Sequence, residues 1–166
     1  MKKMRNYAFA LLAIMFVFAG CNKKNSDVDA RDAFVGTYTY VTDGEMTFST
    51  FVPGVKPKLP LKSDGVIQIE KLGKQDSVII SGAFGDKVAP FKATVKGSQL
   101  EFVEDSYVAK GQTFEALMTI SNHTASLAKD TLTWVDDHVV CDGEMMSVEI
   151  EGEGHVTMTA TKKSVK

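Results

Sequence analysis

The stretch FVGTYTYV, residues 34–41, alternates bulky and small side chains along its whole length. A period of two residues is typical of a β-strand, because successive side chains of a strand point to opposite faces of a sheet. Alternation of this kind returns at 114–120, 147–151 and 156–161. These segments predict antiparallel strands, each with one face in a core and one face in water.

Turn-forming residues divide the chain at intervals of about ten residues. Three Asp-Gly pairs predict tight turns, since both positions adopt positive φ at low cost: Asp43-Gly44, Asp64-Gly65 and Asp142-Gly143. We place further turns at Gly73, Gly85-Asp86, Gly97-Ser98, around His123 and at Gly152–Gly154. The strands expected between them are 34–42, 45–52, 65–72, 76–83, 88–95, 99–105, 112–121, 130–136, 138–150 and 155–162.

Helical patterns are weak throughout the chain after residue 34. The nearest approach to an amphipathic helix is 105–111, and the proline-rich segment 53–60 predicts a long loop. Many short strands in one domain form either a sandwich or a closed barrel. Closure removes exposed strand edges, so we predict an all-β domain over 34–163, an antiparallel up-and-down β-barrel of about eight to ten strands.

The amino terminus has the features of a secretion leader over residues 1–20. Three positive charges precede the apolar run 8–18, and the small residues Ala19-Gly20 directly precede Cys21. As a helix the apolar run would span about 17 Å, less than the ~30 Å of a bilayer core. The run therefore predicts a signal peptide and not a membrane span.

The four residues Phe18-Ala19-Gly20-Cys21 resemble the lipobox of bacterial lipoproteins, usually Leu-(Ala/Ser)-(Gly/Ala)-Cys. The resemblance implies a diacylglyceryl anchor on Cys21 and a place in the bacterial cell envelope, at the outer membrane with a periplasmic or surface face. The polar, charged residues 21–33 predict a lipidated tether. The alternative is an ordinary signal peptide followed by a coincidental cysteine.

Charge and cysteine content narrow the function further. Without the leader the chain carries 16 positive and 21 negative side chains, a formal charge of −5. An acidic chain with no basic stripe argues against nucleic acid as a partner. With Cys21 acylated, Cys141 is a lone thiol, and its apolar neighbours favour a buried strand residue over a reactive nucleophile.

The stretch Asp32–Tyr38 resembles the first strand of the calycins, the superfamily of lipocalins and fatty-acid-binding proteins. Phe34, Gly36 and Tyr38 fit the pattern Phe-x-Gly-x-Trp, with Tyr in place of Trp. The resemblance implies a lipocalin-like barrel that encloses a ligand. No helical lid follows the first strand and no Arg-x-Tyr occurs near the C-terminus, so a fatty-acid function is not implied.

Aromatic residues at strand positions are the candidate lining of such a cavity: Tyr38, Tyr40, Phe48, Phe102, Phe114 and Trp134. An enclosed, aromatic-lined space suits a small apolar or amphipathic ligand. Side chains can equally fill the interior of an eight-stranded barrel. The sequence leaves both possibilities open.

Motifs for catalysis or metal binding are lacking in the sequence. His123, His138 and His155 have no metal-ligand spacing, and no nucleophile motif is present. We therefore predict a non-catalytic protein with no cofactor and no metal site. Calcium on the acidic segment 136–153, or chemistry at Cys141 or a histidine, is the weaker alternative.

Two functions remain from the sequence. The first is a lipid-anchored barrel that binds a small hydrophobic ligand. The second is a protein-binding module of the envelope, either a hydrolase inhibitor or an assembly subunit, that would use loops such as 52–61.

Overall fold

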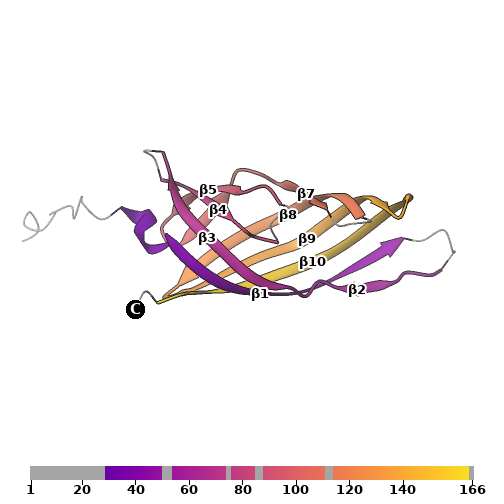
Figure 1. Ribbon diagram of the computed structural model, residues 1–166, viewed down its shortest axis with the longest axis horizontal. Coiled ribbons are helices and arrows are strands. Elements are labelled where there is room, and N and C mark those ends of the chain that lie inside the picture. Colours follow the sequence, from indigo (N-terminus) through magenta and orange to yellow (C-terminus); the bar gives the residue numbers. More distant parts are fainter. Residues whose placement is uncertain (1–28, 50–53, 74–75, 85–87, 111–113, 165–166) are drawn as a thin grey trace, which may run out of the picture.

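The computed structural model describes residues 29–49, 54–73, 76–84, 88–110 and 114–164, which form one antiparallel sheet closed into a barrel (Figure 1). A short 3-10 helix, η1 (Ala30–Ala33), precedes the strands. The strands are β1 (Gly36–Ser49), β2 (Lys58–Pro60), β3 (Asp64–Leu72), β4 (Ser77–Ser81), β5 (Phe91–Lys96), β6 (Gln99–Phe102), β7 (Ser106–Lys110), β8 (Phe114–Ala128), β9 (Thr131–Met145) and β10 (Val148–Lys162). The prediction of an all-β antiparallel barrel is confirmed.

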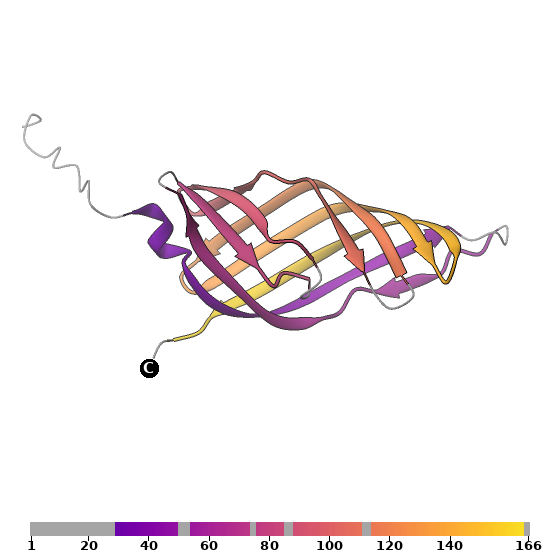
Figure 2. The ribbon, with the colours of Figure 1, turned by 45° about the horizontal axis from the view of Figure 1, so that its top comes forward.

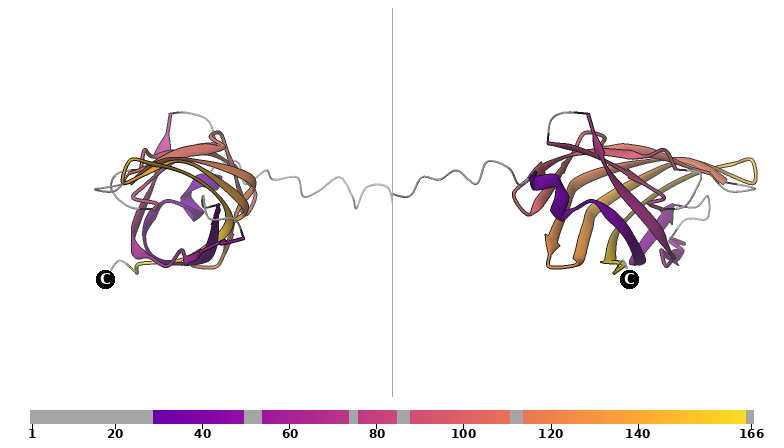
Figure 3. Two further views of the ribbon diagram at one scale, coloured as in Figure 1. Left: turned by 90° about the vertical axis from the view of Figure 1, so that its right-hand side faces the viewer. Right: turned by 60° about the vertical axis from the view of Figure 1, so that its left-hand side comes forward.

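The barrel has eight positions, and two of them are each shared by a pair of short strands. β2 and β3 continue one another along β1 in a single register, because Glu45 faces Pro60 and Val41 faces Asp64. β6 and β7 continue one another along β8 in the same way. The pairing of β10 with β1 closes the ring, which Figure 3 shows end-on.

The strands differ strongly in length. β1 has 14 residues and β8, β9 and β10 have 15 each, about 50 Å at ~3.3 Å per residue. β4, β5 and β6 have only five, six and four residues. As Figure 2 shows, the short strands complete the wall near η1, and the long strands run on toward the other end.

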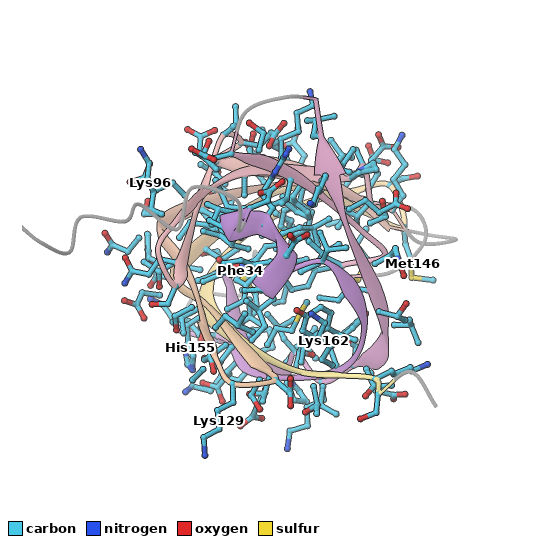
Figure 4. The ribbon with its side chains drawn as sticks, turned by 90° about the vertical axis from the view of Figure 1, so that its left-hand side faces the viewer. Phe34, Lys96, Lys129, Met146, His155 and Lys162 are labelled. Carbon is cyan, nitrogen blue, oxygen red and sulfur yellow. The ribbon has the colours of Figure 1, made fainter. Side chains whose placement is uncertain are left out.

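We call the end near η1 the packed half. Its core is a continuous cluster of buried side chains from every strand position, among them Phe34, Tyr38, Ile69, Phe91 and Trp134. Figure 4 looks onto this end, where η1 lies across the ring of strands with Phe34 inside it. The Tyr38 hydroxyl donates a 2.6 Å hydrogen bond to the Phe34 carbonyl, which fixes the chain as it enters β1.

Polar contacts hold η1 on the packed half. Asp29 caps the helix, and its carboxylate is bridged by Arg31 at 2.7 Å and by Lys71 at 2.9 Å. Hydrogen bonds from these two cations hold the pKa of Asp29 well below its usual range. Arg31 also donates to the carbonyl of Gly73 at 3.2 Å, so the residues just before β1 are tied to the end of β3.

We call the other end the open half. Its buried cluster is small and comes from four strands: Met46, Ala116, Met118, Val139, Cys141 and Val156. Cys141 is buried there within β9, as the sequence predicts. The wall beside this cluster is incomplete, since β2 and β7 each pair with one strand in the described part of the chain.

A change of phase in two strands separates the halves. On β9 the inward residues are Trp134 and Asp136, and then Val139 and Cys141, so the alternation skips one residue. β8 makes the same change between Ile120 and Ala125, around Asn122 with φ 55°. The register of β10 shifts at the same level, between Gly154 and Val156. This irregularity bends the wall and re-aims the side chains beside it.

Several predicted turns are wrong. β1 runs straight through Asp43-Gly44, β9 through Asp142-Gly143, and β10 through Gly152–Gly154. Asp64-Gly65 lies at the start of β3. Glycine is required at such positions because neighbouring strands approach closely there. A Cβ on Gly154, for example, would lie 2.1 Å from the carbonyl oxygen of Glu45. The turns at Gly73 and Gly97-Ser98 are confirmed, and Gly85-Asp86 lies outside the described residues.

Two further local predictions need correction. His123 lies inside β8 and not in a turn. The segment 105–111, the nearest approach to a helix in the sequence, holds strand β7. The predicted loop 53–60 contains β2, a short edge strand in which Pro60 is tolerated at the end. Residues 30–33 of the predicted tether form η1.

Candidate functional site

The open half contains a pocket of about 290 Å³ between β2 and β7. Ten of its lining residues are apolar or aromatic, or the thiol Cys141, and three are polar. The lining consists of Thr42, Met46, Phe48, Pro60, Leu61, Lys62, Ser63, Phe84, Tyr107, Ala109, Met118, Cys141 and Val156. Small-molecule sites are commonly concave, mainly apolar and ~300–1,000 Å³ in volume, so this pocket is at the small end of that range.

The floor of the pocket is apolar and deformable. Met46 and Met118 are buried there beside Cys141 and Val156. Methionine is unbranched and adapts its shape to irregular partners. Burial raises the pKa of the Cys141 thiol, so this sulfur contributes a small apolar surface and no thiolate at neutral pH.

The rim is polar on the β2–β3 side. The Thr42 hydroxyl accepts a 2.8 Å hydrogen bond from the Ser63 backbone N–H and lies 3.1 Å from the Leu61 carbonyl. These bonds fix the junction at which β3 ends its pairing with β1 and β2 begins. Lys62 lies on the same rim, 3.6 Å from the carboxylate of Asp43. The pocket is thus an apolar surface with its polar groups at the mouth.

Two aromatic rings form the inner wall, where the open half meets the packed half. Phe84 and Tyr107 stack in parallel with ring centroids 5.3 Å apart. Both line the pocket, and both also pack against the packed-half cluster. Phe84 lies outside any strand and has φ 58°, a strained conformation for a bulky residue.

A buried polar group lies behind that wall. Asp136 is fully buried and accepts a 2.9 Å hydrogen bond from Nε1 of Trp134. His123, with 7% of its side chain exposed, places Nδ1 3.2 Å from Oδ1 of Asp136. Neither histidine nitrogen, nor Oδ2 of Asp136, has a hydrogen-bond partner in the described part of the chain.

Burial controls the charge of this pair. Desolvation raises the pKa of Asp136 to about 7 and lowers the pKa of His123 to about 4. A hydrogen bond from Trp134 partly offsets the first shift, and the charge of Asp137 adds to it. Between these two pH values both side chains are neutral, which avoids the larger cost of a buried charge.

The six predicted cavity residues are divided between the halves. Tyr38, Tyr40 and Trp134 are buried in the packed half, and Phe102 packs against the same cluster with its ring centroid 3.7 Å from that of His123. Phe48 lines the pocket. Phe114 belongs to β8, but its side chain lies outside the described residues.

Most pocket residues escaped the sequence analysis. Met46, Ala109, Met118 and Val156 have the same alternating pattern as core residues, so nothing in the pattern separates a pocket floor from a filled interior. One available signal was the break in alternation between Ile120 and Ala125, which marks where the core changes. The shortness of β4 and β5, which cannot line the full length of the barrel, was no such signal, because turn spacing predicted longer strands at 76–83 and 88–95.

The acidic segment does not gather into a metal site in the described residues. Asp136 is buried, whereas His138 and His155 are exposed. Across the parts of the chain that the structure describes, no three His, Cys, Asp or Glu side chains are grouped to share a metal ion. A second hollow of about 360 Å³ lies against the exposed carboxylates of Asp142, Glu151 and Glu153.

No protein-family model and no curated protein matches this chain. Among the described residues, no helix is both long enough and apolar enough to cross a bilayer. The fold and the pocket are therefore the basis for a function.

Proposed function

We propose that this protein is a lipid-anchored, calycin-like barrel of the bacterial envelope that binds a small apolar or amphipathic ligand without chemistry. The observation that carries the proposal is the pocket between β2 and β7, whose floor is apolar and whose mouth is polar. A buried apolar surface with a polar opening suits a ligand that has an apolar body and a wet end.

The proposal assigns different tasks to the two halves. The packed half, with η1 across its end, supplies a rigid frame. The open half supplies the binding surface on Met46 and Met118. Long strands anchored in a packed core keep the backbone of the site in place when it is empty, so that only side chains adapt, which reduces the cost of binding.

The anchor at Cys21 follows from the lipobox resemblance. Asp29, which begins the described chain beside η1, lies eight residues further along the chain, a reach of at most ~26 Å. An anchor there holds the packed half toward the membrane. The open half, toward which the long strands run in Figure 1, would then face away from it.

A pair of neighbouring residues on β7 tests the ligand site. Ala109 lines the pocket, whereas Val108 is 40% exposed. In full-length mature protein carrying Cys21→Ser, titration with 1-anilinonaphthalene-8-sulfonate should show saturable binding. Ala109→Phe should weaken it about tenfold by filling the pocket, a loss of ~1.4 kcal/mol, and Val108→Phe should leave it unchanged.

Cys141 offers a second readout in the same protein, because it is then the remaining cysteine. It lines the pocket floor, so bound probe should slow its labelling by a small thiol reagent. Equal binding by Ala109→Phe and wild type, with no protection of Cys141, would exclude the pocket as the site.

A protein-binding role is the second candidate, and exposed apolar side chains favour it. Val108 and Leu117 are direct cross-strand neighbours on the open half and are 40% and 46% exposed. Exposed apolar neighbours of this kind mark contact surfaces. If this function holds, Leu117→Asp should abolish capture of an envelope protein from extract, and Ala109→Phe should not.

A further inference from the structure

The buried pair His123–Asp136 has more hydrogen-bonding capacity than the described part of the protein uses. Three of its polar atoms have no partner there: both imidazole nitrogens and Oδ2 of Asp136. Each such buried atom carries a desolvation cost that a single contact would remove. Within the described residues, the pair receives a hydrogen bond from Trp134, which donates to Oδ1 of Asp136.

The pair lies directly behind the pocket. Val156 lines the pocket and is the cross-strand partner of Asp136, so their Cβ atoms are about 5 Å apart. Tyr107 also lines the pocket, and the charge of Asp136 raises the pKa of its phenol, after the larger effect of burial. The pocket and the pair are therefore separated by a single layer of side chains.

Phe84 is the member of that layer best placed to move. It stacks on Tyr107 and makes an edge contact with Trp134 at 5.4 Å between centroids. Its backbone lies outside the strands, at φ 58°, and its side chain is only half-buried. Rotation of this ring would join the pocket to the polar pair without breaking the pairing of any strand.

We propose that His123 and Asp136 bind the hydroxyl group of an amphipathic alcohol whose apolar chain lies in the pocket, with Phe84 turned aside. The inference rests on the ligand-binding function and names the chemical class of its ligand. A hydroxyl both donates and accepts a hydrogen bond, which matches a pair that offers both kinds of atom.

An uncharged ligand group fits the surroundings. Among the described residues, the titratable groups that interact with Asp136 are Tyr107 on β7, His123 on β8 and Asp137 on β9, and none of them is Lys or Arg. The aromatic rings of Phe91 and Phe102 enclose the imidazole on the packed side. A charged head would lose its hydration there without an opposite charge to compensate.

The test compares two ligands that differ by one donor, 1-decanol and its methyl ether 1-methoxydecane. Trp134 is the single tryptophan and donates to Asp136, so its emission reports on the pair. In full-length mature protein, decanol should bind about tenfold more tightly than the ether, the effect of one net hydrogen bond. Decanol should also shift the emission of Trp134.

Variants identify the side chains that distinguish the alcohol from the ether. His123→Leu loses no hydrogen bond in the described structure and should reduce the ratio of the two affinities to about one, whereas the exposed His138→Leu should keep it. Asp136→Asn retains an acceptor for Trp134 and should keep the fold while changing the ratio.

The outcomes are distinct. Equal binding of alcohol and ether by the wild-type protein would overturn the hydroxyl site and leave the pocket intact as a ligand site. Binding of neither would overturn the ligand-binding function itself. Discrimination that survives in both His123→Leu and Asp136→Asn would also overturn the assignment to this pair.

Discussion

The packed half and the open half are built on the same four long strands, yet only the packed half has a filled core. In the packed half, β3, β4, β5 and β6 complete the wall, and large rings such as Trp134 and Phe91 fill it. In the open half, β2 and β7 replace them and the inward residues are small or flexible, such as Ala116 and Met118. The alternation of the long strands is the same in both halves, so the strands that complete the wall decide whether the barrel interior is filled.

The largest expected difference is between two phenylalanines. Phe91→Ala removes a buried ring from the packed half and should lower the free energy of unfolding by about 3–5 kcal/mol. Phe48→Ala removes a half-buried ring at the pocket and should cost about 1 kcal/mol, because solvent already reaches that site. Urea unfolding with unchanged m-values measures both. Equal losses would contradict the division into halves.

The closing pairing of β1 with β10 should be sensitive to one glycine in the open half. A Cβ on Gly154 would meet the backbone oxygen of Glu45 at 2.1 Å, whereas a Cβ on Gly152 would first meet the ring of Phe48 at 2.9 Å. Gly154→Ala should destabilise by about 1–3 kcal/mol, since backbone must shift. Gly152→Ala should lower the free energy of unfolding by less in the same urea assay, because the ring of Phe48 can move aside. A larger loss for Gly152→Ala than for Gly154→Ala would contradict the observed pairing of β1 with β10.

A smaller effect is expected from one hydroxyl in the packed half. Tyr38→Phe removes the 2.6 Å hydrogen bond to the Phe34 carbonyl and should cost about 1 kcal/mol. Burial raises the pKa of Tyr38 to about 12, so the bond persists up to strongly alkaline pH. Thermal unfolding of the variant should show the loss without any change in ligand binding, because η1 packs on the packed half and the pocket lies in the open half. A weaker pocket in this variant would show that the halves are coupled.

We expect the smallest effect on wild-type stability from a change of pH, which titrates the buried pair Asp136 and His123 at the boundary between the halves. The raised pKa of Asp136, about 7 against an ordinary 3.8, stabilises the fold fully below pH 3.8, and this contribution is lost as the pH rises to 7. The lowered pKa of His123, about 4 against 6.5, adds stability above pH 6.5 that is lost as the pH falls to 4. The two contributions oppose each other between pH 4 and 6.5, so the pair should leave stability nearly level there.

Single variants should reveal each contribution. Relative to wild type, His123→Leu should lose stability as the pH rises from 4 to 6.5, and Asp136→Asn should gain stability over the same range. Urea midpoints measured at each pH, with His138→Leu as the control, check both signs. Parallel profiles for all four proteins would show that the pair does not titrate as buried neutral groups.

Local sequence predicted the structure correctly where a segment met a single structural requirement. Alternation at 34–41 and 156–161 predicted strands that pair with one another and close the barrel. The Gly97-Ser98 hairpin also followed from turn chemistry. Asp43-Gly44 has the same turn chemistry but lies inside β1, because the close approach of β10 needs a glycine there for a different reason. An Asp-Gly pair by itself does not show whether its glycine is required by a tight turn or by the close approach of a neighbouring strand.

The class of the fold could be predicted from local pattern alone, since a period of two residues divided by turns is typical of an antiparallel all-β domain. Local pattern could not predict that half of the barrel is filled and half holds a pocket, or that His123 and Asp136 meet between the two halves. Inward side chains of a core and of a pocket are equally apolar, so their pattern along a strand is the same. What separates them is whether strands such as β4 and β5 are long enough to place a second layer of side chains against them.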